Sequence, residues 1–252
     1  MKKYIYQARY AGHVIRYKLL YPSTRFLFQP WLQRIDTNLY DVHVDIKNIP
    51  LARTMLPEDS SDAYVEYRCL IELTAKALLQ YDCCIFHSVS FVWNDYAWLL
   101  AAPSGTGKTT QYFNWQELFP DEITMISGDM PVLERRDDGS VWAHPTSWNG
   151  KENIGNRICA PVAGIVILKQ GQENAIRPLT AVDGTMPFFM QFMVRPESED
   201  EILALTRIMD QMLRNIPVWE LVNTGDRDST RLLRSTLLTR LNELTGNEHA
   251  NI

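Results

Sequence analysis

Residues 97–111 constrain this chain more than any other stretch, because an apolar run leads into a glycine-containing loop and then into a helix-compatible run. The eight residues from Ala102 to Thr109 read Ala-Pro-Ser-Gly-Thr-Gly-Lys-Thr, which fits the phosphate-binding loop pattern with alanine at the usual first glycine. Glycine at 105 and 107 lets backbone N–H groups curl around phosphate oxygens, and the following helix adds the positive end of its dipole. The stretch therefore predicts a strand, a nucleotide-binding loop and a helix.

Two side chains of this loop have expected roles of their own. Lys108 is expected to be an exposed lysine at a helix start that reaches the β- and γ-phosphates, and the Thr109 hydroxyl is expected to bind Mg²⁺. The residues predicted to hold the nucleotide are Pro103, Ser104, Gly105, Thr106, Gly107, Lys108, Thr109 and Thr110.

The overall composition argues against some classes of binding partner and against export from the cell. The 252 residues carry a formal net charge of −5, so no broad basic field favours nucleic acid or an anionic membrane. No apolar run approaches the ~20 residues of a membrane span, and the N-terminus lacks the apolar core of a signal peptide. We therefore expect a cytoplasmic protein. The cysteines show no metal-type spacing and are expected to be reduced core thiols; they are Cys69, Cys83, Cys84 and Cys159.

The first 82 residues are predicted to form an N-terminal β-rich module with a linking helix. Strands are expected at 3–10, 13–20 and 39–46, and a loop at 47–61. Ser61 or Asp62 is expected to cap a helix of about 18 residues. The residues predicted to share its buried face are Tyr64, Tyr67, Ile71, Ala75 and Leu78.

Residues 83–252 alternate between strand and helix patterns. The predicted strands are 86–93, 97–102, 122–127, 132–134, 141–143, 163–168 and 217–222. The predicted helices are 108–118, 181–193, 199–214 and 226–244, with a frayed polar tail from Thr245.

The motifs of this second part resemble the kinase domain of HPr kinase/phosphorylase and its relatives, over roughly residues 62–244. In that family a histidine lies about twenty residues before the loop lysine, as His87 does before Lys108. About twenty residues after the loop, the family and the ATP-dependent phosphoenolpyruvate carboxykinases carry an Asp-Asp pair at a strand end, and the matching stretch here is Ile-Ser-Gly-Asp-Met-Pro at 126–131. The run 145–153 is also similar to a stretch in bacterial relatives.

The sequence departs from that family at the first aspartate, because Gly128 precedes Asp129. The resemblance implies that Asp129 holds Mg²⁺ and that an acidic group accepts the proton of the substrate hydroxyl. With one carboxylate, Asp129 must do both, or pass one task to His87, Glu152 or Asp137. For Asp137-Asp138 a hairpin turn is the favoured interpretation, and His87 can instead be a hydrogen-bonded histidine inside a strand.

The stretch 148–152 combines an aromatic residue, a glycine and a cation in one loop. Trp148, Lys151 and Glu152 are therefore candidates to bind the substrate, and an ordinary surface turn is the alternative. Three arginines can each supply charge to a transferring phosphoryl group, and nothing in the sequence selects among them: Arg157, Arg195 and Arg207.

Taken together, residues and resemblance predict an α/β fold, a P-loop kinase core at 83–252 on a mixed, partly antiparallel sheet, with the small β/α module at 1–82 in front. The predicted function is ATP- and Mg²⁺-dependent transfer of the γ-phosphate to a hydroxyl, with serine of a protein or peptide favoured. Asp129, His87 and Lys108 are the predicted catalytic residues, and Thr109 and Asp129 the predicted metal ligands. Two alternatives remain open. One is a kinase for free serine, in which Lys151 binds the carboxylate of the substrate, and the other is a nucleotide-binding accessory protein without catalysis. Assembly into a homo-oligomer is also open.

Overall fold

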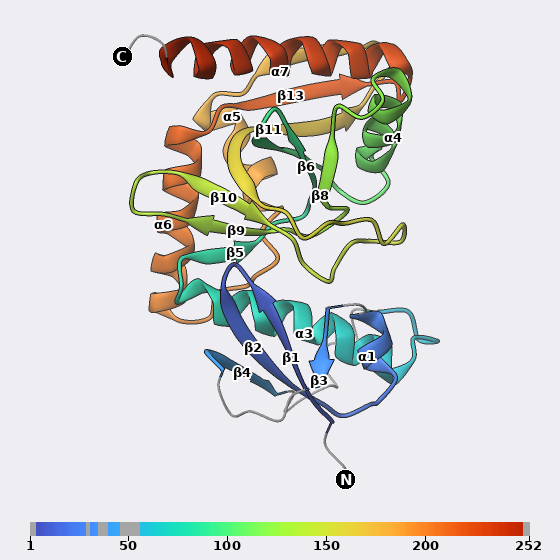
Figure 1. Ribbon diagram of the computed structural model, residues 1–252, viewed down its shortest axis with the longest axis vertical. Helices are drawn as coiled ribbons and strands as arrows, with labels where there is room; N and C mark the ends of the chain where they lie inside the picture. The colour runs from blue at the N-terminus through green and yellow to red at the C-terminus, as the bar shows by residue number, and fades with distance from the viewer. Residues whose placement is uncertain (1–3, 29–30, 35–39, 46–55, 249–252) are drawn as a thin grey trace.

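The structure is a computed structural model that describes residues 4–28, 31–34, 40–45 and 56–248. It is a mixed α/β protein with two sheets, a small one near the N-terminus and a large one in the rest of the chain (Figure 1). None of the helices within the described ranges is long and apolar enough to cross a membrane.

The small sheet has the strand order β3-β1-β2-β4. The two predicted strands β1 (Tyr4–Tyr10) and β2 (His13–Leu19) form an antiparallel hairpin, and Ala11 and Gly12 turn the chain with φ of 46° and 83°. Strand β3 (Gln33–Arg34) pairs antiparallel with β1, and β4 (Val42–Asp45) pairs parallel with β2. Most of the predicted loop at 47–61 lies outside the described residues.

Helix α3 (Asp62–Leu79) packs against the small sheet, and the short helix α1 (Thr24–Leu27) lies beside it. Ser61 caps α3 as predicted, because its hydroxyl accepts a hydrogen bond from the Tyr64 N–H at 3.3 Å. The predicted face was only partly correct: Tyr64 is exposed, whereas Val65 and Leu70 are buried. The helix also contacts β5 and α6 on its other side, so its buried stripe is wider than one face.

The large sheet contains nine strands and is mixed, as predicted. Its centre is β11 (Ala160–Gln170), which runs parallel to both β7 (Tyr96–Ala101) and β13 (Val218–Asn223). Antiparallel pairs extend it through β6 (Ser88–Trp93), β8 (Thr124–Ser127) and β12 (Ala175–Pro178). The remaining strands, β10 (Val141–His144), β9 (Val132–Arg135) and β5 (Cys83–Ile85), continue from the start of β11.

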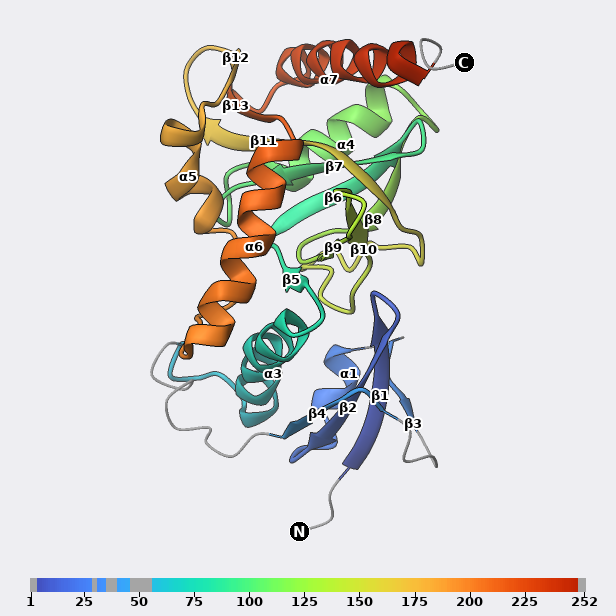
Figure 2. The same ribbon diagram turned by 90° about the vertical axis from the view of Figure 1, so that its left-hand side faces the viewer.

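Helices cover both faces of the strands around β7. Trp98 and Leu100 belong to a core shared with α4 (Lys108–Leu118) and α7 (Arg227–Glu248). The alternate residues Leu99 and Ala101 belong to the other core, which includes α6 (Glu199–Asn215) and Phe188 of α5 (Ala181–Phe189). Figure 2 shows α6 on the side of the sheet away from α7, reaching down to α3. Alternation along a buried strand thus sets the layers.

Two predicted helix ends were wrong. Helix α5 stops at Phe189 and not at 193, because the chain leaves it to pair with residues 85–87, at the end of β5 and just before β6. The His87 N–H donates to the Gln191 carbonyl at 2.7 Å, and the Met193 N–H to the Ile85 carbonyl at 2.9 Å. Helix α7 continues past Thr245 to Glu248, so the tail is helical there.

One continuous core joins the small sheet to the large one. This core includes Tyr10, Phe28, Ile85 and Ile165, so it extends across residues 82–83. The division of the chain into two domains at that point stays a prediction. Cys83 and Cys84 are buried at the start of β5 as predicted, but the expectation of a core thiol was wrong for Cys159, which is exposed.

Candidate functional site

The loop between β7 and α4 has backbone angles that require glycine. Gly105 has a φ of 82° and Gly107 a φ of 107°, a region in which a residue with a Cβ is strained. Gly107 is the N-cap of α4 and provides no side-chain cap. The first N–H groups of the helix therefore lack intrahelical acceptors.

These N–H groups make the loop fit a phosphate group. Within the described part of the chain, the N–H groups of Gly105, Gly107, Lys108 and Thr109 donate to no backbone carbonyl outside the regular elements. They lie at the positive end of an eleven-residue helix. The predicted loop residues that line the cavity here are Ser104, Gly105, Gly107, Lys108, Thr109 and Thr110. The other two shape the loop, because the Thr106 hydroxyl donates to the Pro103 carbonyl at 2.9 Å.

Lys108 is folded back onto the loop, and the expectation of an exposed lysine was wrong. Its side chain is buried, and its Nζ donates to the Ala102 carbonyl at 2.7 Å. The same Nζ lies 3.2 Å from Nε2 of His87. Burial lowers the pKa of Lys108, and the negative charge of Asp129 opposes that shift. Lys108 is thus a desolvated cation that has an acidic group in its vicinity.

His87 does not itself line the cavity, but it lies between Lys108 and Asp129, which do. Its Nε2 is 3.2 Å from Oδ1 of Asp129 as well as 3.2 Å from Nζ of Lys108. The backbone ties the carboxylate to this strand, because the Ser88 N–H donates to the Asp129 carbonyl at 2.8 Å. A single ring nitrogen can accept from the ammonium or donate to the carboxylate, but not both. The proton on Nε2 therefore decides which neighbour His87 binds.

Gly128 is glycine because the next loop passes too close for a side chain. A Cβ at this position would lie 2.6 Å from the Asn149 carbonyl oxygen and 3.0 Å from that of Ile154. No aspartate fits there with the loop in place, and Asp129 is the single carboxylate at the end of β8.

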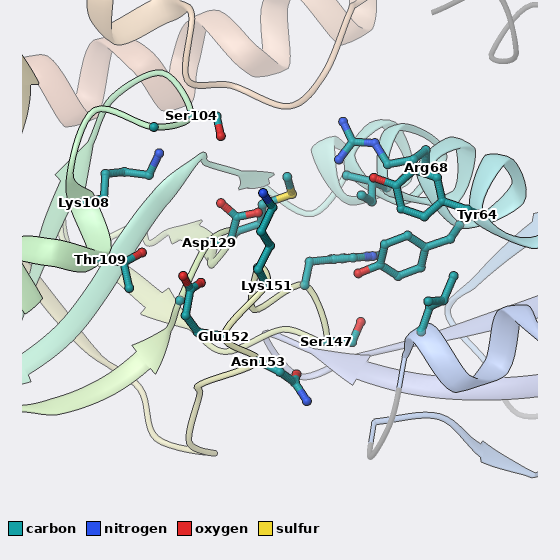
Figure 3. Close-up of a pocket in the computed structure, with 18 of the residues that line it drawn as sticks. Tyr64, Arg68, Ser104, Lys108, Thr109, Asp129, Ser147, Lys151, Glu152 and Asn153 are labelled. Atoms are coloured by element: carbon teal, nitrogen blue, oxygen red, sulfur yellow. The ribbon is translucent and has the colours of Figure 1, made fainter. Parts of the chain in front are cut away.

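The loop at 147–155 lines the cavity through Lys151 and Glu152, which are exposed (Figure 3). Trp148 is different: its ring is buried, with centroids 5.3 Å from Tyr10 and 5.7 Å from Phe28. Trp148 therefore anchors this loop to the small sheet, although part of it forms the cavity wall.

Several candidates lie away from the cavity. Asp137 is fully exposed in the turn between β9 and β10, 3.8 Å from Arg135, so it does not take a task from Asp129. Arg157 stacks over the Trp31 ring at 5.0 Å, and Arg207 approaches Asp82 at 3.8 Å. Neither these two nor Arg195 lines the cavity.

The cavity has a volume of about 710 Å³, and one of its walls comes from the N-terminal part of the chain. The sequence pattern did not indicate this wall, because Tyr64, Tyr67 and Ile71 were predicted to be core residues and the other three belong to no motif. Its residues are Phe26, Leu27, Tyr64, Tyr67, Arg68 and Ile71.

The few oxygen atoms at this site suit Mg²⁺, which also binds water and substrate phosphates, better than a metal ion that is coordinated by protein side chains alone. No group of three or more His, Cys, Asp or Glu side chains suited to a metal occurs in the described ranges. The Thr109 hydroxyl and the carboxylates of Asp129 and Glu152 line one region of the cavity (Figure 3). Mg²⁺ typically takes one or two carboxylates together with substrate phosphates and water.

Comparison with known proteins adds little to this geometry. No protein-family profile matches the chain, and no curated protein matches its sequence. Among solved structures, the HPr(Ser) kinase/phosphatase from Coxiella burnetii is similar with a TM-score of 0.40 and 9% identity, over 66% of this chain and 96% of that one. A likeness of this size carries no information on activity, so the function must be judged from the residues in the cavity.

Proposed function

We propose that the chain is an ATP- and Mg²⁺-dependent phosphotransferase that transfers the γ-phosphate to a hydroxyl group, with serine of a protein or peptide as the acceptor. The observation that carries the proposal is the row formed by Lys108, His87 and Asp129, with successive contacts of 3.2 Å and 3.2 Å, beside a loop of free N–H groups. A cation, a proton carrier and a carboxylate at a phosphate loop are the groups that phosphoryl transfer needs.

Each residue of the row has a task in this proposal. Bound Mg-ATP supplies the transferable phosphoryl group and the cation that neutralises its charge. Lys108 leaves the Ala102 carbonyl and donates to a phosphate oxygen, while the loop N–H groups hold the phosphate chain. The Thr109 hydroxyl and the Asp129 carboxylate are the oxygens that would hold Mg²⁺.

The same movement frees His87. Once Lys108 no longer donates to Nε2, a proton on this nitrogen can be donated to Asp129, and an unprotonated nitrogen can accept the proton of the acceptor hydroxyl. Either His87 or Asp129 then serves as the base. Positioning and electrostatics supply most of the rate in this class of reaction.

Transfer of label from γ-labelled ATP, with serine peptides and free serine as acceptors, tests the proposal. His87→Ala should lower transfer at least ~10²-fold, the lower end of general base catalysis, with ATP affinity kept and the melting temperature within a few degrees. The control is His144→Ala, since His144 pairs with Glu134 at 2.9 Å outside the cavity. A destabilised His87 variant with normal activity per folded molecule would contradict the assignment.

A nucleotide-binding accessory protein without catalysis is the second candidate. The observation that favours it is Gly128. A Cβ at this position would lie 2.6 Å from the Asn149 carbonyl oxygen, so an aspartate does not fit there. Saturable ATP binding without label transfer to any hydroxyl or to water would support this candidate and contradict the kinase.

A further inference from the structure

The cavity wall made by α1 and α3 exposes apolar side chains to the site. Phe26 is 66% exposed, and Leu27 and Tyr64 are exposed beside the cavity. Exposed aromatic and aliphatic groups at a cavity that also contains charged groups are typical of ligand recognition.

Arg68 adds a cation to this apolar wall. It follows Tyr64 by four residues on α3, so both lie on one side of the helix. Figure 3 shows the side chains of Tyr64 and Arg68 extending from α3 toward the side of the cavity where Lys108 lies. Within the described ranges Arg68 has no carboxylate partner at ion-pair distance.

The groups around Arg68 leave its charge available. Its neighbour Tyr67 is neutral, because burial raises the pKa of that phenol. Of the two other cations that line the cavity, Lys108 is held by the Ala102 carbonyl at 2.7 Å, and Lys151 lies on the 147–155 loop and not on the N-terminal wall. Asp129 contacts His87 at 3.2 Å. Arg68 is therefore the cation of the N-terminal wall that has no assigned partner.

We propose that this wall, called here the acceptor wall (Phe26, Leu27, Tyr64 and Arg68), recognises an acceptor that carries an anionic group and an apolar group near its hydroxyl. Arg68 binds the anion, since a guanidinium forms paired hydrogen bonds with a carboxylate or phosphate, and the aromatic rings cover the apolar part. The inference rests on the proposed phosphoryl transfer and adds the chemistry of its acceptor.

The anion has two sources that share this chemistry. One is a small hydroxy acid, and the other is a peptide in which an acidic and an apolar residue flank a serine. The cavity volume of about 710 Å³ lies within the range of ligand sites.

The test compares charged and neutral probes of each source by calorimetric titration. The small pair is 3-phenyllactate and its amide, and the peptide pair is the capped tetrapeptide leucyl-seryl-glutamyl-phenylalanine and its glutamine analogue. Each probe is titrated with and without a non-hydrolysable ATP analogue and Mg²⁺. The proteins are the unaltered chain, Arg68→Gln, Arg68→Lys and the control Arg214→Gln, which alters an exposed arginine paired with Asp210 on α6.

We expect the anionic member of one pair to bind at least about tenfold more tightly than its neutral partner, as a charge-assisted hydrogen bond provides. The pair that shows this preference identifies the source. The preference should persist in Arg214→Gln, weaken in Arg68→Lys and disappear in Arg68→Gln.

Equal affinity within both pairs, no binding of any probe, or a preference that survives in Arg68→Gln would overturn the acceptor wall. Binding of the ATP analogue and label transfer are measured on the same preparations. Failure of the acceptor wall alone leaves these unchanged, whereas failure of the proposed function removes them.

Discussion

The two sides of the cavity are built in opposite ways. The phosphate side comes from eight consecutive residues, 103–110, whose backbone needs glycine at two positions with φ of 82° and 107°. The acceptor wall comes from residues on α1 and α3, which are separated in the sequence by β3 and β4. A local backbone requirement leaves a pattern in the sequence, whereas a wall assembled by packing leaves none.

This difference has a functional consequence. Changes on the phosphate side should alter ATP binding and every transfer reaction, and changes on the acceptor wall should alter the acceptor alone. The following variants separate the two sides, beginning with the largest expected effect.

Lys108→Ala should abolish tight ATP binding, with a loss of roughly 10²-fold in affinity and more in turnover, because one charge-assisted donor to the phosphates is lost. The protein should remain folded, since Nζ contacts the loop carbonyl of Ala102 and no apolar core. Calorimetric titration with ATP measures the affinity, and far-ultraviolet circular dichroism measures whether the variant is folded. An affinity within a few-fold of the parent would mean that the loop does not hold the β- and γ-phosphates.

Asp129→Asn should lower turnover at least ~10²-fold, and further if a Mg²⁺ ligand is lost as well. ATP affinity measured without Mg²⁺ should change little, because the loop N–H groups and Lys108 remain. Asp137→Asn is the matched control, as this carboxylate lies exposed in a turn outside the cavity. Near-full activity of Asp129→Asn would shift the role to Glu152, which should then be tested in the same assay.

Gly128→Ala should destabilise the fold by about 1–3 kcal/mol, because the added Cβ forces the 149–154 loop to move. The same movement displaces Lys151 and Glu152, so transfer per folded molecule should also fall. The control is Gly246→Ala in α7, where no atom lies within 4 Å of the added Cβ. Denaturant unfolding measures the stability of both variants. An unchanged unfolding midpoint for Gly128→Ala would show that the loop moves aside with no loss of stability.

Tyr10→Phe should have the smallest effect, near 0.5–1.5 kcal/mol of stability, through loss of the buried 2.8 Å hydrogen bond between its hydroxyl and Ser147. Since Ser147 lies on the cavity, the KM for the acceptor should rise modestly while the affinity for ATP stays the same.

The control for this variant is Tyr17→Phe, which removes the 2.9 Å bond to Thr74 in the same core. It should cost similar stability without changing the KM. Equal KM values in both variants would contradict a role of the small sheet in holding the site loop.

Much of the architecture could be predicted because it follows from local patterns. The hairpin at Ala11-Gly12, the cap at Ser61 and the buried strand β7 each depend on neighbouring residues. The errors occurred where distant segments compete for the same groups. Helix α5 ends early because Gln191 pairs with His87, more than a hundred residues earlier in the chain.

The sequence by itself determined the glycine-containing loop at 103–110 and the mixed α/β class, which follow from short-range rules for glycine, helix ends and strand alternation. The nearness of His87 and Asp129 to Lys108 was implied by the family resemblance and not by such rules. Only the tertiary structure decided that Trp148 is an anchor, that Gly128 must lack a side chain, and that Arg68 faces the site. Each of these depends on which surface of another element comes within contact distance, and no pattern within one segment encodes that distance.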